Sequence, residues 1–153
     1  MSNGIDIEFL EFILQYAYKL NDKRQQMQYL FDIVRNNGES WEYEEVNTKI
    51  LEYIIEECEF DNELIFEYVF ALQKLATVMH RSYNTEQLFA GKELCEKALD
   101  RYEESGLDNE YLKSHIYKTL EDCCSYLAEY EEIKIFAREN CNYYLIAKTD
   151  AVH

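Results

Sequence analysis

The sequence contains no proline and only four glycines among its 153 residues. Because proline breaks helix interiors and glycine weakens them, this scarcity favours long helices joined by short turns. No stretch reaches the ~20 consecutive apolar residues that a transmembrane helix needs, so we expect no membrane-spanning segment. The first residues also lack the basic region and long apolar run of a secretory signal peptide.

Basic residues are scarce as well, with 15 against 31 acidic residues and a formal net charge of −16. Nucleic-acid backbones and anionic membrane surfaces attract clustered lysine and arginine, so we expect this chain to bind neither directly. A partner that is itself a basic protein or peptide is compatible with this charge.

The residues needed for metal or catalytic chemistry do not occur in suitable patterns. The five cysteines are odd in number and include no C-x-x-C pair, which fits neither a disulfide framework nor a zinc site. Neither His80 nor His115 follows a glutamate at the three-residue spacing of a di-iron site. No glycine-rich phosphate loop is present. We therefore expect a reduced, cytoplasmic protein that has no catalytic residues, metal or cofactor and is not an enzyme.

Apolar periodicity and capping residues predict an all-α fold of about seven antiparallel helices, within a single domain that spans 1–153. Candidate N-caps are Asp22, Ser40, Asp61, Asn84 and Asp108, and Gly38 and Gly106 are candidate helix stops. The expected helices cover 6–20, 23–36, 41–59, 62–81, 85–105, 109–127 and 129–147. In this scheme residues 1–21 form a capping helix, and 22–60, 61–105 and 106–148 form three helix pairs.

Three of the expected helices share one internal spacing of apolar and small residues. Consecutive copies of this pattern are offset by 45 and 42 residues. Helix pairs with such a repeat cannot bury both faces alone, so they stack. An ordinary up-down helix bundle also produces spacings of three and four, and it remains the alternative architecture. The matching residues are Tyr43, Val46, Ile50, Tyr53 and Ile54; Leu88, Gly91, Cys95, Ala98 and Leu99; and Tyr130, Ile133, Ala137, Asn140 and Cys141.

The stretch "YLAEYEEIKIFAREN", residues 126–140, resembles the turn and second helix of a tetratricopeptide repeat. Leu127 and Ala128 stand where that family has Leu-Gly, and Tyr130 stands at its turn aromatic. "GKELCEKAL", residues 91–99, is similar to the second-helix half of the same motif. The chain departs from the family in its longer offsets and in having no proline at the repeat ends. The longer offset resembles that of the peptide-sensing tetratricopeptide regulators of Gram-positive bacteria. The resemblance implies an α-solenoid of helix pairs that binds a protein or peptide.

Acidic residues are concentrated between Glu39 and Glu67, where eleven of them accompany one basic residue, Lys49. Five glutamates of the expected third helix share one face, which we call the acidic strip. Like charges at these spacings repel one another, so folding alone does not favour the strip. It is either a solvated surface or a docking strip for a basic partner. The strip consists of Glu42, Glu45, Glu52, Glu56 and Glu59.

Two functions follow from these patterns. The first is a non-enzymatic helical-repeat module, an adaptor or regulator, that binds a protein or peptide in the groove of its stack. The alternative is an acidic inhibitor or immunity-type protein that neutralises a basic partner or imitates nucleic-acid phosphates.

Overall fold

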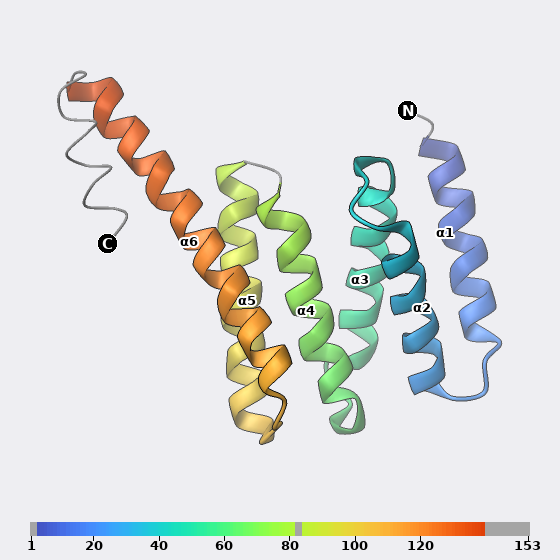
Figure 1. The fold of residues 1–153 in the computed structure, drawn as a ribbon. Helices are drawn as coiled ribbons and strands as arrows, with labels where there is room; N and C mark the ends of the chain where they lie inside the picture. The colour runs from blue at the N-terminus through green and yellow to red at the C-terminus, as the bar shows by residue number, and fades with distance from the viewer. Residues whose placement is uncertain (1–2, 82–83, 140–153) are drawn as a thin grey trace.

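The computed structural model describes residues 3–81 and 84–139, and every regular element in these ranges is helical. The all-α prediction is therefore confirmed. Figure 1 shows the helices following one another across the molecule from α1 to α6, with consecutive helices running in opposite directions. The elements are α1 (Asn3–Tyr18), α2 (Lys23–Asn37), η1 (Trp41–Tyr43), α3 (Glu44–Cys58), η2 (Asn62–Leu64), α4 (Ile65–His80), α5 (Thr85–Ser105) and α6 (Glu110–Glu139).

Most of the predicted capping residues lie at observed helix ends, although α1 begins three residues earlier than expected and α3 and α4 each begin three residues later. The Asp22 carboxylate accepts the backbone N–H of Arg24 at 3.1 Å, and the Asn84 side chain accepts that of Glu86 at 2.9 Å. Ser40 and Asp61 cap the short 3₁₀ turns that precede α3 and α4. Gly38 and Gly106 both have positive φ, 68° and 74°, as expected of glycines that terminate helices.

At the last helix, the structure differs from the prediction in one capping residue and one helix boundary. The first turn of α6 is capped by Asn109, whose side chain accepts the Leu112 N–H at 3.0 Å, rather than by the expected Asp108. The expected break between residues 127 and 129 is absent, because α6 continues from Glu110 to Glu139. Leu127, Ala128 and Glu129 all favour helix, and neither glycine nor proline interrupts them. The described residues therefore form six α-helices where we expected seven, and residues 140–147 of the expected seventh lie outside the described ranges.

The core runs through the whole row of helices. α4 packs against α3 on one side and against α5 and α6 on the other, while α1 packs on α2 and α3. The connection between α4 and α6 includes a buried hydrogen bond from Gln73 Nε2 to Thr119 Oγ1 at 3.2 Å. The largest fully buried side chains come from every helix described; they include Ile13, Met27, Leu30, Ile50, Leu51, Ile54, Tyr68, Leu72, Leu88 and Ile116.

A glycine allows α5 to approach its neighbours closely. A Cβ atom added at Gly91 would lie 3.1 Å from Cys123 Sγ and 3.3 Å from the carbonyl oxygen of Ala76. Gly91 thus lies against both α4, the preceding helix, and α6, the following one. Val46, its expected counterpart in α3, is buried, whereas the side chain of Ile133, the third member, lies outside the described part.

No helix in the described ranges is both long enough and apolar enough to cross a membrane.

A groove between α2 and α4 as the candidate functional site

The structure divides the predicted acidic strip into two parts. Glu42, Glu45, Glu52 and Glu56 are exposed, and none of them forms an ion pair within residues 3–81 and 84–139. Glu59 is partly buried, and its carboxylate lies 3.4 Å from the Lys97 ammonium of α5. Four members of the strip therefore lie free on the surface, while the fifth connects two helices.

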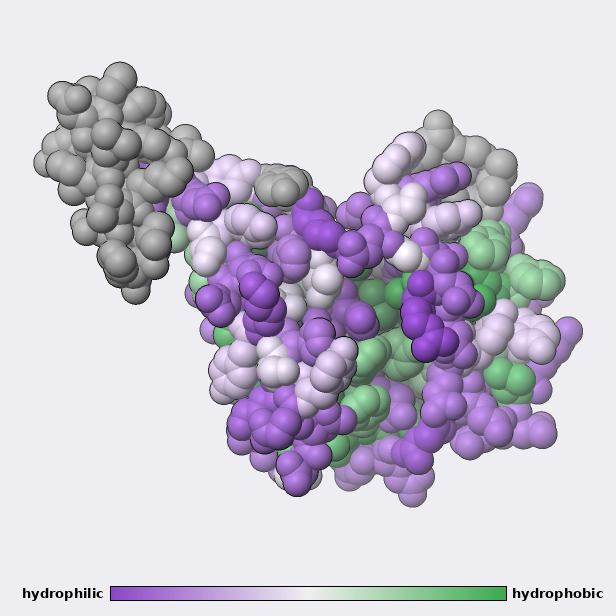
Figure 2. All heavy atoms as spheres, viewed as in Figure 1, coloured by the Kyte–Doolittle hydropathy of each residue, from purple (hydrophilic) through white to green (hydrophobic). Residues whose placement is uncertain are grey.

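The opposite face of α3 carries no strip of charge and forms the floor of a groove. Glu56 follows Asn47 by nine residues, which at about 100° per residue places it about half a turn round the helix. Asn47 and Leu51 lie at the floor of the groove, whose volume is about 310 Å³. α2 and α4 form its two walls. Figure 2 shows hydrophobic side chains gathered in the hollow between these helices, within a largely hydrophilic surface.

Aromatic side chains line the groove along α2 and α4. Phe31 of α2 meets Phe70 of α4 edge to face, with ring centroids 5.0 Å apart. Phe66 stacks on Phe70 at 5.7 Å and remains 38% exposed. Beyond these rings the groove continues into a shallower depression beside Gln28 and Glu67. The apolar surface thus extends along several turns of both walls.

The other end of the groove is held by a buried asparagine. Asn47 is 4% exposed, and its Nδ2 donates to the carbonyl oxygen of Gly38 at 3.2 Å. Asn47 Oδ1 accepts a hydrogen bond from Asn37 Nδ2 at 2.8 Å. Because these bonds tie the last residue of α2 and the glycine that follows it to α3, Asn47 fixes the chain that closes this end.

Three cations surround this end of the groove in a chain that is otherwise strongly acidic. They are Arg35, Lys74 and Arg81, and they share the groove with two acids, Asp32 and Glu39. Arg35 Nη2 lies 2.8 Å from Asp32 Oδ1, and Arg81 Nη1 lies 3.4 Å from Glu39 Oε2. Both acids are therefore already paired with cations of the groove itself.

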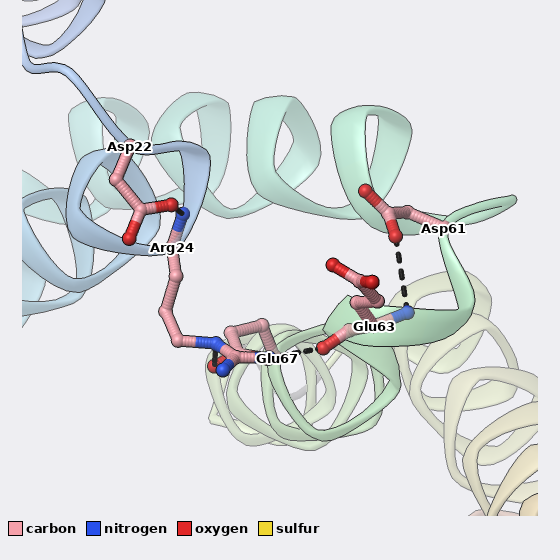
Figure 3. Close-up of polar contacts among 5 residues, drawn as sticks. All are labelled: Asp22, Arg24, Asp61, Glu63 and Glu67. Atoms are coloured by element: carbon pink, nitrogen blue, oxygen red, sulfur yellow. Dashed lines mark hydrogen bonds and ion pairs between the residues drawn. The ribbon is translucent and has the colours of Figure 1, made fainter.

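At the far end, Arg24 connects the N-terminal turns of α2 and α4 (Figure 3). Arg24 Nη2 donates to the carbonyl oxygen of Glu63, and Arg24 Nε lies 3.5 Å from Glu67 Oε2. Glu67 is 7% exposed, and its second oxygen, Oε1, is buried without a hydrogen-bond partner in the described part. Arg24 therefore supplies the charge that this buried carboxylate needs, and it holds α2 beside α4.

Three of the four cysteines in the described ranges lie in the core. Cys58, Cys95 and Cys123 are buried, as expected of small hydrophobic residues, and Cys124 is exposed. Burial raises the pKa of the Cys58 and Cys95 thiols to about 12 and that of Cys123 to about 11. Because the thiolate is the nucleophile, these three residues are unreactive at neutral pH. Among the described residues, no three His, Cys, Asp or Glu side chains are grouped to hold a metal ion.

The sequence predicted the residues of the acidic strip, whereas a binding groove in the stack was expected without any of the residues that line it. A signal was present in the fourth helix, where Phe66, Phe70, Lys74 and Arg81 recur at helical spacings and carry aromatic or positive side chains in an acidic chain. Pairing that stripe with Phe31 and Arg35 of α2 required knowledge that the two helices lie side by side.

Comparison with protein-family models, with curated proteins and with solved structures finds no match for this chain.

Proposed function

We propose that this chain is a non-enzymatic protein- or peptide-binding module, an adaptor or regulator, whose helices stack in pairs in the manner of tetratricopeptide repeats. Its binding surface is the groove between α2 and α4. The observation that carries this proposal is an apolar groove of about 310 Å³ that is walled by aromatic rings and open to solvent.

Several features of the groove support peptide binding. Aromatic side chains are enriched where proteins bind one another, because they contribute large contact areas. Phe31, Phe66 and Phe70 supply such area along one line. A groove between helices also suits a segment that lays an apolar face into it. Asn47 and Arg24 hold the two ends of the groove, which lowers the ordering cost of binding.

The acidic strip supports a second function, an inhibitor or immunity-type protein that binds a basic partner or imitates nucleic-acid phosphates. Four of its glutamates are exposed without an ion pair in the described part of the chain. Glu45, Glu52 and Glu56 lie on the side of α3 away from the groove, and Glu42 lies in η1, just before α3. Such charges accelerate encounter with a basic surface, and salt screens that effect.

The proposal is tested with a pair of phenylalanine variants. Proteins captured from the native cell are identified by mass spectrometry, and their affinities for purified wild-type, Phe66→Glu and Phe89→Glu proteins are measured. Phe66 lies in the groove, while Phe89 is a 50% exposed residue of α5 outside it. We expect Phe66→Glu to weaken binding by about tenfold or more, as for an aromatic residue at an interface centre, and Phe89→Glu to leave it unchanged.

Equal binding by both variants would show that the groove is not the site. If binding also fell steeply with salt and after glutamine replaced Glu45, Glu52 and Glu56, the inhibitor-type function would be supported instead.

A further inference from the structure

We infer that the segment which binds in the groove is an amphipathic peptide with apolar anchors and at least one carboxylate, placed to meet Lys74. This inference rests on the proposed function and specifies the chemistry of the partner. It differs from the basic partner that the net charge of −16 suggests.

Lys74 is the cation that the groove leaves without a counterion. Its side chain is exposed, and no carboxylate of the described residues lies within ion-pair distance of its ammonium group. Its Nζ lies 5.2 Å from the centroid of the Phe70 ring. The ammonium group is therefore positioned directly beside the aromatic wall.

The two acids that line this part of the groove do not neutralise Lys74. Asp32 is paired with Arg35, and Glu39 is paired with Arg81. One positive charge remains at this end when the two pairs are set aside. A carboxylate on the bound segment would complete the third pair, whereas a lysine or arginine there would be repelled by the unpaired ammonium group of Lys74.

The apolar part of the segment is indicated by the neighbouring rings. Phe70 lies one turn before Lys74 and Phe66 lies two turns before it, on the same face of α4. A segment that places an aliphatic or aromatic anchor on these rings would bring a residue one or two turns along it to Lys74, if it is helical. Charge on one flank of an apolar face is the pattern of an amphipathic helix that binds in a groove.

The inference is tested by selecting binders from a displayed library of random 16-residue peptides against the full chain. Selected peptides are synthesised, and their affinities are measured by fluorescence anisotropy for the wild type and four variants. The groove variants are Phe66→Glu, Lys74→Gln and Lys74→Glu. Lys49→Gln is the matched control, because Lys49 is exposed on the acidic side of α3 and forms no ion pair within residues 3–81 and 84–139.

We expect the selected peptides to be amphipathic and to contain Asp or Glu. Exposed ion pairs contribute up to about 1 kcal/mol, so Lys74→Gln should weaken binding about three- to fivefold. Lys74→Glu should weaken it further, because the attraction becomes repulsion, and Lys49→Gln should change it less than twofold. Phe66→Glu should weaken it most.

The other outcomes separate this inference from the function on which it rests. Suppose the selected peptides are basic or neutral and bind the Lys74 variants as well as wild type, but lose affinity with Phe66→Glu. That result would overturn the inference that the peptide carries a carboxylate, and it would leave the groove as the binding site. Peptides that bind Phe66→Glu as well as wild type would overturn both. A selection that yields no binder would also count against both.

Discussion

The two faces of α3 have opposite characters, and their comparison separates charge from binding capacity. The outer face carries Glu45, Glu52 and Glu56, which are exposed and form no ion pair with any residue of the described ranges. The inner face presents Asn47 and Leu51 to a groove that two other helices complete. The outer face is strongly negative, whereas the inner face borders a concave groove with apolar surface and a locally positive charge. The distribution of charge along a sequence therefore predicts where the most charged surface lies. The surface with the concave shape and apolar area suited to binding can lie elsewhere.

The largest expected effect comes from the contact that holds the groove walls together. Arg24→Met keeps much of the apolar stem but leaves Glu67 buried without its cation. We expect the free energy of unfolding to fall by roughly 1–3 kcal/mol, as for a buried polar group that loses its partner. Urea denaturation provides the measurement.

Lys23 offers the matched control, because it is adjacent to Arg24 and lies 3.8 Å from Glu57 in a solvent-exposed pair. Lys23→Met should cost less than about 1 kcal/mol. If Glu67→Gln restores stability to the Arg24→Met protein, the cost arises from the unpaired carboxylate. Equal destabilisation by Arg24→Met and Lys23→Met would contradict this account.

A smaller effect is expected at the other end of the groove. Asn47→Ala removes the hydrogen bonds to Gly38 and Asn37, and it leaves the Gly38 carbonyl without this donor. The expected loss is about 1–2 kcal/mol in thermal or urea unfolding. Asn62→Ala, at an exposed position in η2, is the control and should have little effect. A stable Asn47→Ala protein with unchanged peptide affinity would show that this end of the groove does not depend on the asparagine.

The smallest effect is expected on the outer face. Replacing Glu45, Glu52 and Glu56 with glutamine should raise stability by a few tenths of a kcal/mol, because Glu52 and Glu56 are one turn apart, Glu45 is one turn from Glu42, and like charges at that spacing repel. Glu59→Gln should do the reverse, since Glu59 is paired with Lys97. Thermal unfolding at low and high salt measures the stability change of each variant relative to the wild type. Both changes should shrink as salt rises, because salt screens these charges. A large loss of stability in the triple variant would show that the strip has a structural role.

Local rules in the sequence predicted most of the helices but little of the site. Asp22 and Asn84 were recognisable because a cap depends on residues two or three positions away. The break expected near Leu127 and Ala128 was wrong, because it relied on a motif position where this chain lacks the glycine that would stop a helix.

Predicting which residues line the groove requires knowing which helices lie next to each other. Arg24 and Glu67 are 43 residues apart, as their numbers in the sequence show, and no periodicity within α2 or α4 reveals that they meet. The same limit applied to Glu59, whose place in the strip was predicted while its pairing with Lys97 of α5 was not. Charge patterns along one helix predict exposure, whereas they do not reveal which neighbouring helix supplies a partner.

The buried thiols also allow local opening of the structure to be measured by chemical labelling. Cys58 ends α3, whereas Cys95 of α5 and Cys123 of α6 lie close together where these two helices pack, so the three thiols report on two parts of the row. A thiol reagent reaches such a group only when the surrounding packing opens, and the rate of labelling then measures the free energy of that opening. In a variant with serine at Cys124 and Cys141, three labelling rates would show whether the helices open together or from one end. A row of helices that contact mainly their neighbours allows the second behaviour, which a single closed core does not.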